Sequence, residues 1–270
     1  MESEALIRLS SFVGALVVLL LCERLWPRRP WRQLRIQRLG INLGLIALSG
    51  IIQRFTLGAA AVLMAFYAQQ HGWGLLNLVD LPFWLLLIAG ILLLDLAIYL
   101  QHVMFHAVPV LWRLHQVHHA DLDLDATTGL RFHPLEMLTS LIYKVLVVAA
   151  LGVNPIVVIL FEVILNVSSM FNHSNLRIPA SIERWLRWLI VTPDMHRIHH
   201  SVHRVETDSN YGFFLSIWDR LLGTYTNKPK DGHETMLLGL DYAQQPEKLS
   251  LGRLLIMPFV VSPRALNEKK

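Results

Sequence analysis

Five long apolar runs, separated by short polar stretches, dominate the pattern of hydrophobic and polar positions in this chain. The runs cover residues 5–22, 39–68, 82–100, 135–151 and 155–171. Each approaches or exceeds the length of about 20 residues that an α-helix needs to cross the hydrocarbon core of a bilayer. We therefore predict an all-α fold: a polytopic membrane helical bundle.

The second run is too long for one simple span. Residues 39–68 would form a helix about 45 Å long, whereas the hydrocarbon core is about 30 Å thick. We expect this run to be tilted, broken or partly re-entrant. Its only charge, Arg54, must face protein or water, either as a lipid headgroup contact or in a structural pair.

The fourth and fifth runs predict a helical hairpin, because Gly152-Val-Asn-Pro155 between them is a turn signal. Lys144 lies nine residues before Val153 and Glu162 nine residues after it. An antiparallel pair that turns at Val153 brings the two charges to one depth. Because an unpaired charge in hydrocarbon is costly, we predict that they pair.

Three polar or shorter segments complete the pattern. Ile182–Val191, with two tryptophans, is typical of an amphipathic helix at a membrane interface. Leu249–Val261 is apolar but too short to span, so we expect it to lie on the membrane or to pack against the polar cap. Ala120–Thr128 holds Asp121, Asp123 and Asp125 but lacks the glycine and glutamate of a calcium loop, so we predict a solvated loop.

Composition supports the membrane class, with 54% hydrophobic and 16% charged residues. The single cysteine, Cys22, excludes an intramolecular disulfide framework. The net charge of +4 comes largely from a basic stretch that carries no nucleic-acid-binding signature, so we expect no nucleic acid partner. This stretch holds Arg24, Arg28, Arg29, Arg32, Arg35 and Arg38.

The basic stretch also predicts the topology. Arginines beside a span mark its cytoplasmic end and favour contact with anionic lipid, which places the N-terminus outside. Acidic Glu2 and Glu4 start the chain and no small-residue cleavage site follows, so we expect a retained helix rather than a signal peptide. Counting the spans then puts residues 102–119 and the C-terminus on the cytoplasmic side. We divide the chain into N-terminal spans with an external loop (1–81), a catalytic domain (82–226) and a cytoplasmic or interfacial tail (227–270).

Histidines cluster in three boxes: His102–His106, His115–His119 and His196–His200. Spacings of three and four residues put side chains on one helical face. The boxes supply eight imidazoles, more than the four ligands or so of one zinc ion, so two metal ions are expected. Imidazole suits iron, copper, zinc and nickel alike. The candidate ligands are His102, His106, His115, His118, His119, His196, His199 and His200, together with His133 and His173.

Three further residues are candidates for holding the ligands in place rather than binding metal. Asp95 lies seven residues before His102 on the same helical face, where it can bond the second nitrogen of an imidazole or pair with Arg54. Glu136 follows His133 by three residues, and His203 follows the third box. His71 and His233 are expected to be surface or loop residues.

Several classes of protein fit the histidine boxes poorly. Neither HExxH nor GxSxG occurs, so hydrolysis fits poorly. A metal transporter would place ionisable groups near the membrane midplane, whereas these histidines gather at one face. A membrane cytochrome b would need facing histidines on its spans. Oxygen activation by two metals is the best fit, with metal transport as the alternative.

Several motifs together resemble the membrane-bound fatty acid hydroxylase and sterol desaturase family over roughly residues 80–226. These are HxxxH, an interval of eight residues, HxxHH, a distant second HxxHH, Arg131-Phe-His-Pro-Leu-Glu136, Asn172-His-Ser-Asn175, Asn210-Tyr-Gly212 and Trp218-Asp-Arg-Leu-Leu-Gly-Thr224. The resemblance implies a histidine-rich di-metal cap with two iron ions (Fe2+/Fe3+). It also implies a lipid substrate that is hydroxylated or desaturated, O2, and a separate electron-transfer protein or reductase. In a bacterium the location would be the inner membrane.

Overall fold

The computed structural model of the protein describes residues 2–56 and 59–260, which form helices, loops and isolated β-bridges. Five of these helices are long and apolar enough to cross a membrane. They are α1 (Glu2–Leu25), α2 (Arg35–Thr56), α4 (Phe83–Ala107), α6 (Pro134–Leu151) and α7 (Pro155–His173). The prediction of an all-α bundle with several membrane helices is confirmed.

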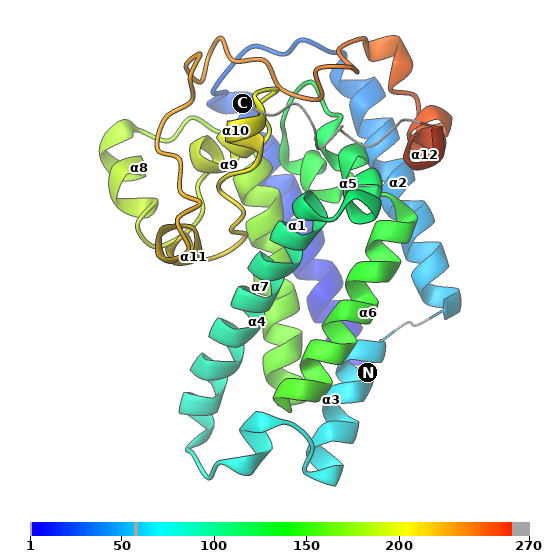
Figure 1. Cartoon of the computed structure of the whole chain (residues 1–270), viewed down its shortest axis with the longest axis vertical. Helices are drawn as coiled ribbons and strands as arrows, with labels where there is room; N and C mark the ends of the chain where they lie inside the picture. Colours follow the sequence, from blue (N-terminus) through cyan, green and yellow to red (C-terminus); the bar gives the residue numbers. More distant parts are fainter. Residues whose placement is uncertain (1, 57–58, 261–270) are drawn as a thin grey trace.

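The long second apolar run is broken, which was one of the three alternatives expected for it. It forms α2 and a shorter helix, α3 (Ala60–His71), which continues toward the lower end of the molecule (Figure 1). Residues 57 and 58 between them lie outside the described residues. Arg54 is exposed near the end of α2.

The helices give the molecule two distinct ends (Figure 1). At the upper end lie the C-terminal ends of α4 and α7, the start of α6, and the short helices α5 (Pro109–His119) and α9 (Pro193–His199). At the lower end lie the turn between α6 and α7 and the loop with η1 (Leu75–Leu78). All three histidine boxes are therefore carried at the upper end.

Two glycines lock the lower end together. Gly152 ends α6 with a φ of 66°, in the left-handed region that favours glycine. A Cβ on Gly74 would lie 2.1 Å from the backbone nitrogen of Gly152. The side-chain amide of Asn77 donates to the carbonyls of Trp73 (2.6 Å) and Gly152 (3.2 Å). The predicted hairpin turn is confirmed, and the loop of residues 72–81 packs directly on it.

The main apolar core lies between α3, α4, α6 and α7. Leu94, Val148, Val157 and Phe161 are all at most 2% exposed there. Burial of such side chains is worth about 1.5–3 kcal/mol each. Within a bilayer the same contacts act through close packing, because lipid tails are as apolar as leucine.

The rest of the chain forms a cap at the upper end. Its helices are η2 (Ala126–Leu130), α8 (Ala180–Leu186), α10 (Arg204–Thr207), α11 (Ile217–Leu221), η3 (Pro246–Lys248) and α12 (Leu251–Val260). The predicted amphipathic segment starts as α8, and its Trp185 and Trp188 are exposed. α12 buries Leu254 and Met257 against α5 and α2. Of the two expectations for this segment, packing against other parts of the protein is the one confirmed. Residue 261, the end of the predicted range, is outside the described residues.

The segment after the second histidine box is buried, and the prediction of a solvated loop is wrong. Asp121, Asp123 and Asp125 are at most 4% exposed. They surround Arg38, whose guanidinium donates to Asp121 (2.9 and 2.8 Å) and to Asp125 (2.7 Å). Burial alone would raise the pKa of Asp121, but the charge of Arg38 outweighs it and lowers that pKa to about 2. The expected contact with anionic lipid is therefore also wrong for Arg38, and for the buried Arg29.

The predicted ion pair inside the hairpin is confirmed. Lys144 Nζ lies 3.1 Å from Glu162 Oε1. The other carboxylate oxygen of Glu162 pairs with Arg8 of α1, a partner that the sequence pattern did not indicate. Two cations and one carboxylate thus join α1, α6 and α7 at membrane depth.

We expect Glu162→Gln to destabilise the protein more than Lys144→Met. Removal of the carboxylate takes a contact from both Lys144 and Arg8 at membrane depth, where an uncompensated charge costs roughly 2.5–3.5 kcal/mol on insertion scales, whereas removal of Lys144 leaves the pair of Glu162 with Arg8. Thermal unfolding of the purified variants measures both losses. The double variant should lose less stability than the sum of the losses in the two single variants. Strictly additive losses would show that the two side chains do not interact.

Candidate metal centre

Four segments bring the histidine side chains together. α4 carries His102 and His106 near its end, and α5 starts two residues after α4 ends, with Pro109 in its first turn. α7 ends at His173. The hydroxyl of Thr192 caps α9 by accepting from the Met195 amide, and Pro193 fits the first helical position.

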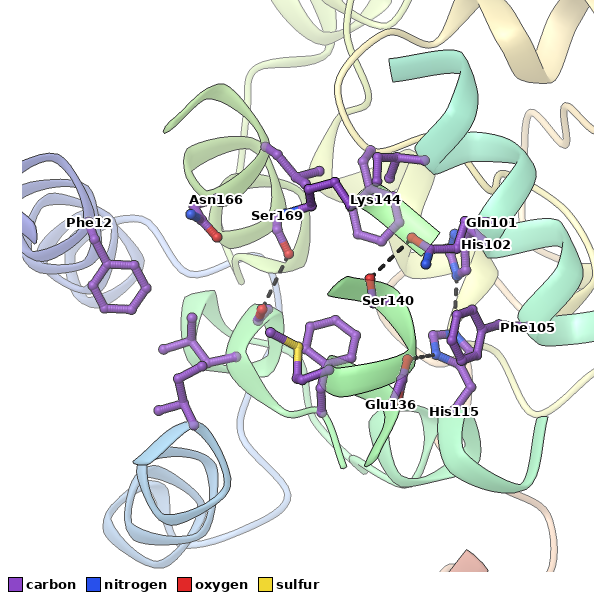
Figure 2. Close-up of a pocket in the computed structure, with 18 residues that line it drawn as sticks. Phe12, Gln101, His102, Phe105, His115, Glu136, Ser140, Lys144, Asn166 and Ser169 are labelled. Carbon is purple, nitrogen blue, oxygen red and sulfur yellow. Dashed lines mark hydrogen bonds and ion pairs between the residues drawn. The ribbon is translucent and has the colours of Figure 1, made fainter. Parts of the chain in front are cut away.

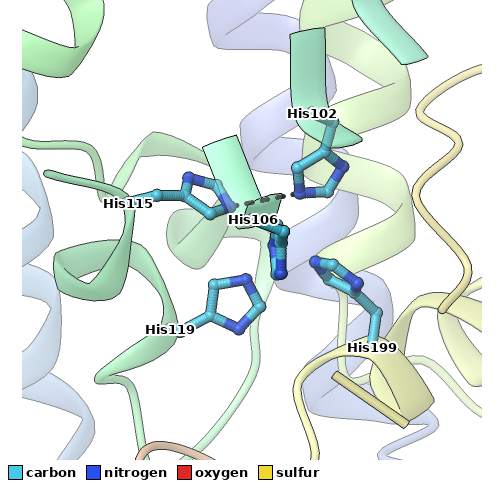
Figure 3. Close-up of side chains that lie close together, drawn as sticks. All are labelled: His102, His106, His115, His119 and His199. Carbon is cyan, nitrogen blue, oxygen red and sulfur yellow. Dashed lines mark hydrogen bonds between the residues drawn. The ribbon is translucent and has the colours of Figure 1, made fainter. Parts of the chain in front are cut away.

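The histidines form two groups in space, and these groups do not correspond to the three boxes of the sequence. In each group the nitrogen atoms that can bind a metal all lie within 4.8 Å of one another. The first group is His102, His106, His115, His119 and His199 (Figure 3), and the second is His118, His173, His196 and His200. Each HxxHH box therefore contributes to both groups. The structure brings together nine of the ten predicted ligands.

Backbone carbonyls fix the orientation of three of these rings. Nδ1 of His102 donates to the Tyr211 carbonyl (2.7 Å), Nδ1 of His199 to that of Ser209 (2.7 Å), and Nδ1 of His173 to that of Ser169 (2.6 Å). A carbonyl can only accept, so the ring proton is on Nδ1 and the Nε2 lone pair is free to bind a metal.

Carboxylates serve the same purpose for two more rings. Nδ1 of His115 lies 2.6 Å from Glu136 Oε1, and Nδ1 of His106 lies 3.4 Å from Asp208 Oδ1. Metal-bound histidines commonly have such partners on the second nitrogen. The expectation that Glu136 supports a ligand is consistent with this contact.

The way in which the inward-facing nitrogens meet is the test of whether a metal fits. Nε2 of His102 lies 3.1 Å from Nε2 of His115, so ring nitrogens face one another across the site. His102 and His199 both keep their lone pairs on Nε2, and their ring centroids are 4.5 Å apart. Nε2 of His199 is buried and has no hydrogen-bond partner among the described residues. Two lone pairs cannot bond each other, whereas a shared cation satisfies both. The nitrogen set fits iron, copper, zinc or nickel.

Burial keeps the rings outside the spans in the neutral form that a metal requires. Loss of hydration lowers the pKa of His115 to about 3. It also lowers the pKa values of His118, His119, His196, His199 and His200 well below the usual value. A site that holds neutral imidazoles in this way can bind metal without first releasing protons.

Four predicted site residues lie outside these groups: Glu136, which contacts His115, and three that contact none of the grouped histidines, namely His133, His203 and Asp95. His133 caps α6 by accepting from the Leu135 amide, and its Nε2 lies 3.2 Å from the Leu255 carbonyl. His203 Nε2 lies 2.6 Å from Asp231.

Asp95 accepts from the Leu215 amide (3.1 Å) and the Trp218 indole (2.8 Å), and its other oxygen has no hydrogen-bond partner among the described residues. It thus holds the segment that presents the Tyr211 carbonyl, and bonds neither to an imidazole nor to Arg54.

An apolar cavity of about 150 Å³ adjoins the first group. His102 and His115 form one wall, together with Phe105, Phe132 and Phe213. Phe12 of α1 lines the opposite side (Figure 2). The residues that line the cavity come largely from helices that are long and apolar enough to cross a membrane.

Comparisons with known proteins agree with this geometry. A model of the fatty acid hydroxylase family matches residues 87–224, which are 138 of the 270 residues. Alkylglycerol monooxygenase of Xenopus tropicalis is 31% identical over 216 residues, which cover 76% of this chain and 45% of that protein. Ornithine lipid hydroxylase OlsE of Rhizobium tropici is 29% identical over 143 residues (53% and 42%), and cholesterol 25-hydroxylase of Mus musculus is 30% identical over 145 residues (52% and 46%). The chain thus spans less than half the length of these curated relatives, and no solved structure matches it.

We expect Glu136→Leu to weaken metal binding about 10–100-fold, because His115 would lose the acceptor that orients its ring. Titration of metal-stripped protein with Fe2+ in the absence of oxygen measures the affinity. Glu136→Gln is the matched control: its amide oxygen still accepts from His115, so affinity should be largely restored. Binding by Glu136→Leu as tight as wild type would show that Glu136 does not support His115 as a ligand.

Proposed function

The chain belongs to the fatty acid hydroxylase family, and we propose that it is a membrane di-iron monooxygenase that hydroxylates, or in some cases desaturates, a lipid. One observation carries the proposal: the imidazoles form two groups of potential metal ligands, and the first group borders an apolar cavity among the membrane helices. The balanced hydroxylation consumes R–H, O2, two electrons and two protons and yields R–OH and water. A separate reductase or electron-transfer protein supplies the electrons.

We propose that the nine clustered histidines bind two iron ions, one in each group. When bound, the iron pair supplies the redox chemistry that inserts oxygen from O2 into an unactivated C–H bond. His133, a candidate ligand by sequence, already uses both ring nitrogens within the protein. Asp95, Glu136 and Asp208 hold the surroundings of the ligands in place.

The protein's own residues keep the reaction dry and oriented. The ring of Phe213 lies 4.9 Å from that of His102, and the ring of Phe132 stacks on His118 at 4.5 Å. These aromatic walls exclude water beside the imidazoles, and an active site without water suppresses side reactions. The relatives are named for three different lipids, an alkylglycerol, an ornithine lipid and cholesterol, so they support lipid oxidation without selecting the lipid. None of these names favours the alternative of metal transport.

We propose that the upper end faces the cytoplasm, with the N-terminus outside and the C-terminus inside. The arginines of residues 24–38 lie at the end of the bundle that carries the histidines. Reporter fusions after Arg38 and Lys230 should be cytoplasmic, and a fusion after Gly74 external. An external signal after Lys230 would contradict a shared cytoplasmic site.

Replacement of one histidine in each group tests the function. We expect His199→Ala and His118→Ala each to lose iron and to lower O2-dependent lipid hydroxylation by more than about 100-fold, since even partners behind the ligands are worth about 10–100-fold. Iron per chain and product, with a reductase supplied, are measured for the purified proteins.

His71→Ala is the control, because His71 is exposed on α3 and distant from both groups in sequence. It should retain both iron and turnover. Full metal content and activity in the His118 and His199 variants would overturn the proposal. A wild-type protein that binds only zinc and oxidises nothing would favour metal transport or storage.

A further inference from the structure

The cavity beside the first histidine group has a polar stripe as well as apolar walls. Glu136, Ser140 and Lys144 follow each other at intervals of four residues on α6, and Ser169 faces them from α7. Polar side chains within a span are rare and normally have partners or a function. Most of this stripe has partners: Glu136 contacts His115, Lys144 contacts Glu162, and Ser169 donates to the Gly129 carbonyl.

Oε2 of Glu136 and Nε2 of Gln101 are both buried at this wall without a hydrogen-bond partner among the described residues, and Gln101 supplies the amide donor. Its side chain lines the cavity and is 5% exposed. Its Oε1 accepts from the Ser140 hydroxyl at 3.2 Å, as Figure 2 shows. Its Nε2 is buried and has no hydrogen-bond partner among the described residues. A buried amide donor without a partner is uncommon, and at a cavity wall its natural partner is a ligand.

The position of Gln101 along the chain indicates which part of the ligand it contacts. Gln101 directly precedes His102 on α4, and both line the cavity. A ligand atom bound by Gln101 therefore lies beside the proposed iron site. A cavity of about 150 Å³ holds about six carbon atoms, the size of benzene. The bound atom and the oxidised carbon must then lie within a few bonds of each other.

We propose that Gln101 donates a hydrogen bond to an oxygen of the substrate, so that the protein selects lipids with an acceptor oxygen close to the hydroxylated carbon. The acceptor is an ether, ester, amide or hydroxyl oxygen, and an unsubstituted hydrocarbon chain lacks it. The inference rests on the proposed lipid hydroxylation and names its substrate class. The rest of such a lipid leaves the cavity past Phe12 and Ile46, which are half-buried on α1 and α2.

Photoaffinity labelling tests this without requiring turnover. Two alkyl diazirine probes of equal length are used, one with an ether oxygen and one with a methylene in its place, because an ether oxygen only accepts. Labelled peptides that contain Phe105 or Phe213 report occupancy of the cavity. Wild-type protein should bind the ether probe at least about tenfold more tightly, the difference that one lost buried hydrogen bond makes. Gln101→Met, of similar length but without the amide, should bring the ratio to about one.

Gln70→Met is the matched control, since Gln70 is exposed on α3, and it should keep the wild-type ratio. Size-exclusion chromatography identifies a variant that fails to fold, and the wild-type ratio remains decisive in that case. Equal labelling by both probes in the wild type, or an unchanged ratio in Gln101→Met, would overturn the inference. An ether preference in a protein that hydroxylates nothing would overturn the proposed function and leave the Gln101 contact standing.

Discussion

The structure depends on holding nine neutral imidazoles with their lone pairs directed inward. A buried lone pair without a donor or a metal is unfavourable, and a ring is held in the orientation that presents it where an acceptor binds its other nitrogen. The carbonyls of Tyr211, Ser209 and Ser169 and the carboxylate of Glu136 do this for four rings. These acceptors come from three separate segments, so the cap, α6 and α7 must all fold before the site exists.

The buried cluster around Arg38 joins the N-terminal helices to this site. Asp121 and Asp125, which bind Arg38, follow the second histidine box directly, and Arg131 donates to the Val117 carbonyl inside that box (3.1 Å). Glu23 of α1 accepts from the amides of Ala126 and Asn175. A buried ion pair of this kind is costly to break because it leaves a charge without a partner. α1 and α2, which precede the residues matched by the family model, therefore help to set the position of the ligands.

Most polar side chains of the membrane helices also have a charged or hydrogen-bonding partner. Glu162 has Lys144 and Arg8, and Ser169 and Glu136 have partners at the cavity wall. Gln101 retains a donor that the protein does not satisfy, next to the first histidine. The proposed lipid hydroxylation would use both features: an apolar path that admits the chain, and one polar contact that decides which carbon lies at the metal site. Binding energy used for such positioning lowers the barrier of the chemical step.

The sequence alone determined the membrane class, the five long apolar helices, a second run too long for one simple span, the hairpin pair of Lys144 and Glu162, and the meeting of the three histidine boxes. These follow from local signals: run length, turn residues, helical spacing and the cost of a lone charge in hydrocarbon. Only the tertiary structure decided that each HxxHH box serves both groups, because helical spacing states which rings share a face and not which neighbours they meet. It also decided that Asp121 and Asp125 are buried around Arg38, and that backbone carbonyls such as that of Tyr211 orient the rings. Every residue has a backbone carbonyl, so the sequence does not indicate which carbonyl will orient a ring. An aspartate-rich loop has the same polar sequence whether its carboxylates are hydrated or paired with a distant arginine.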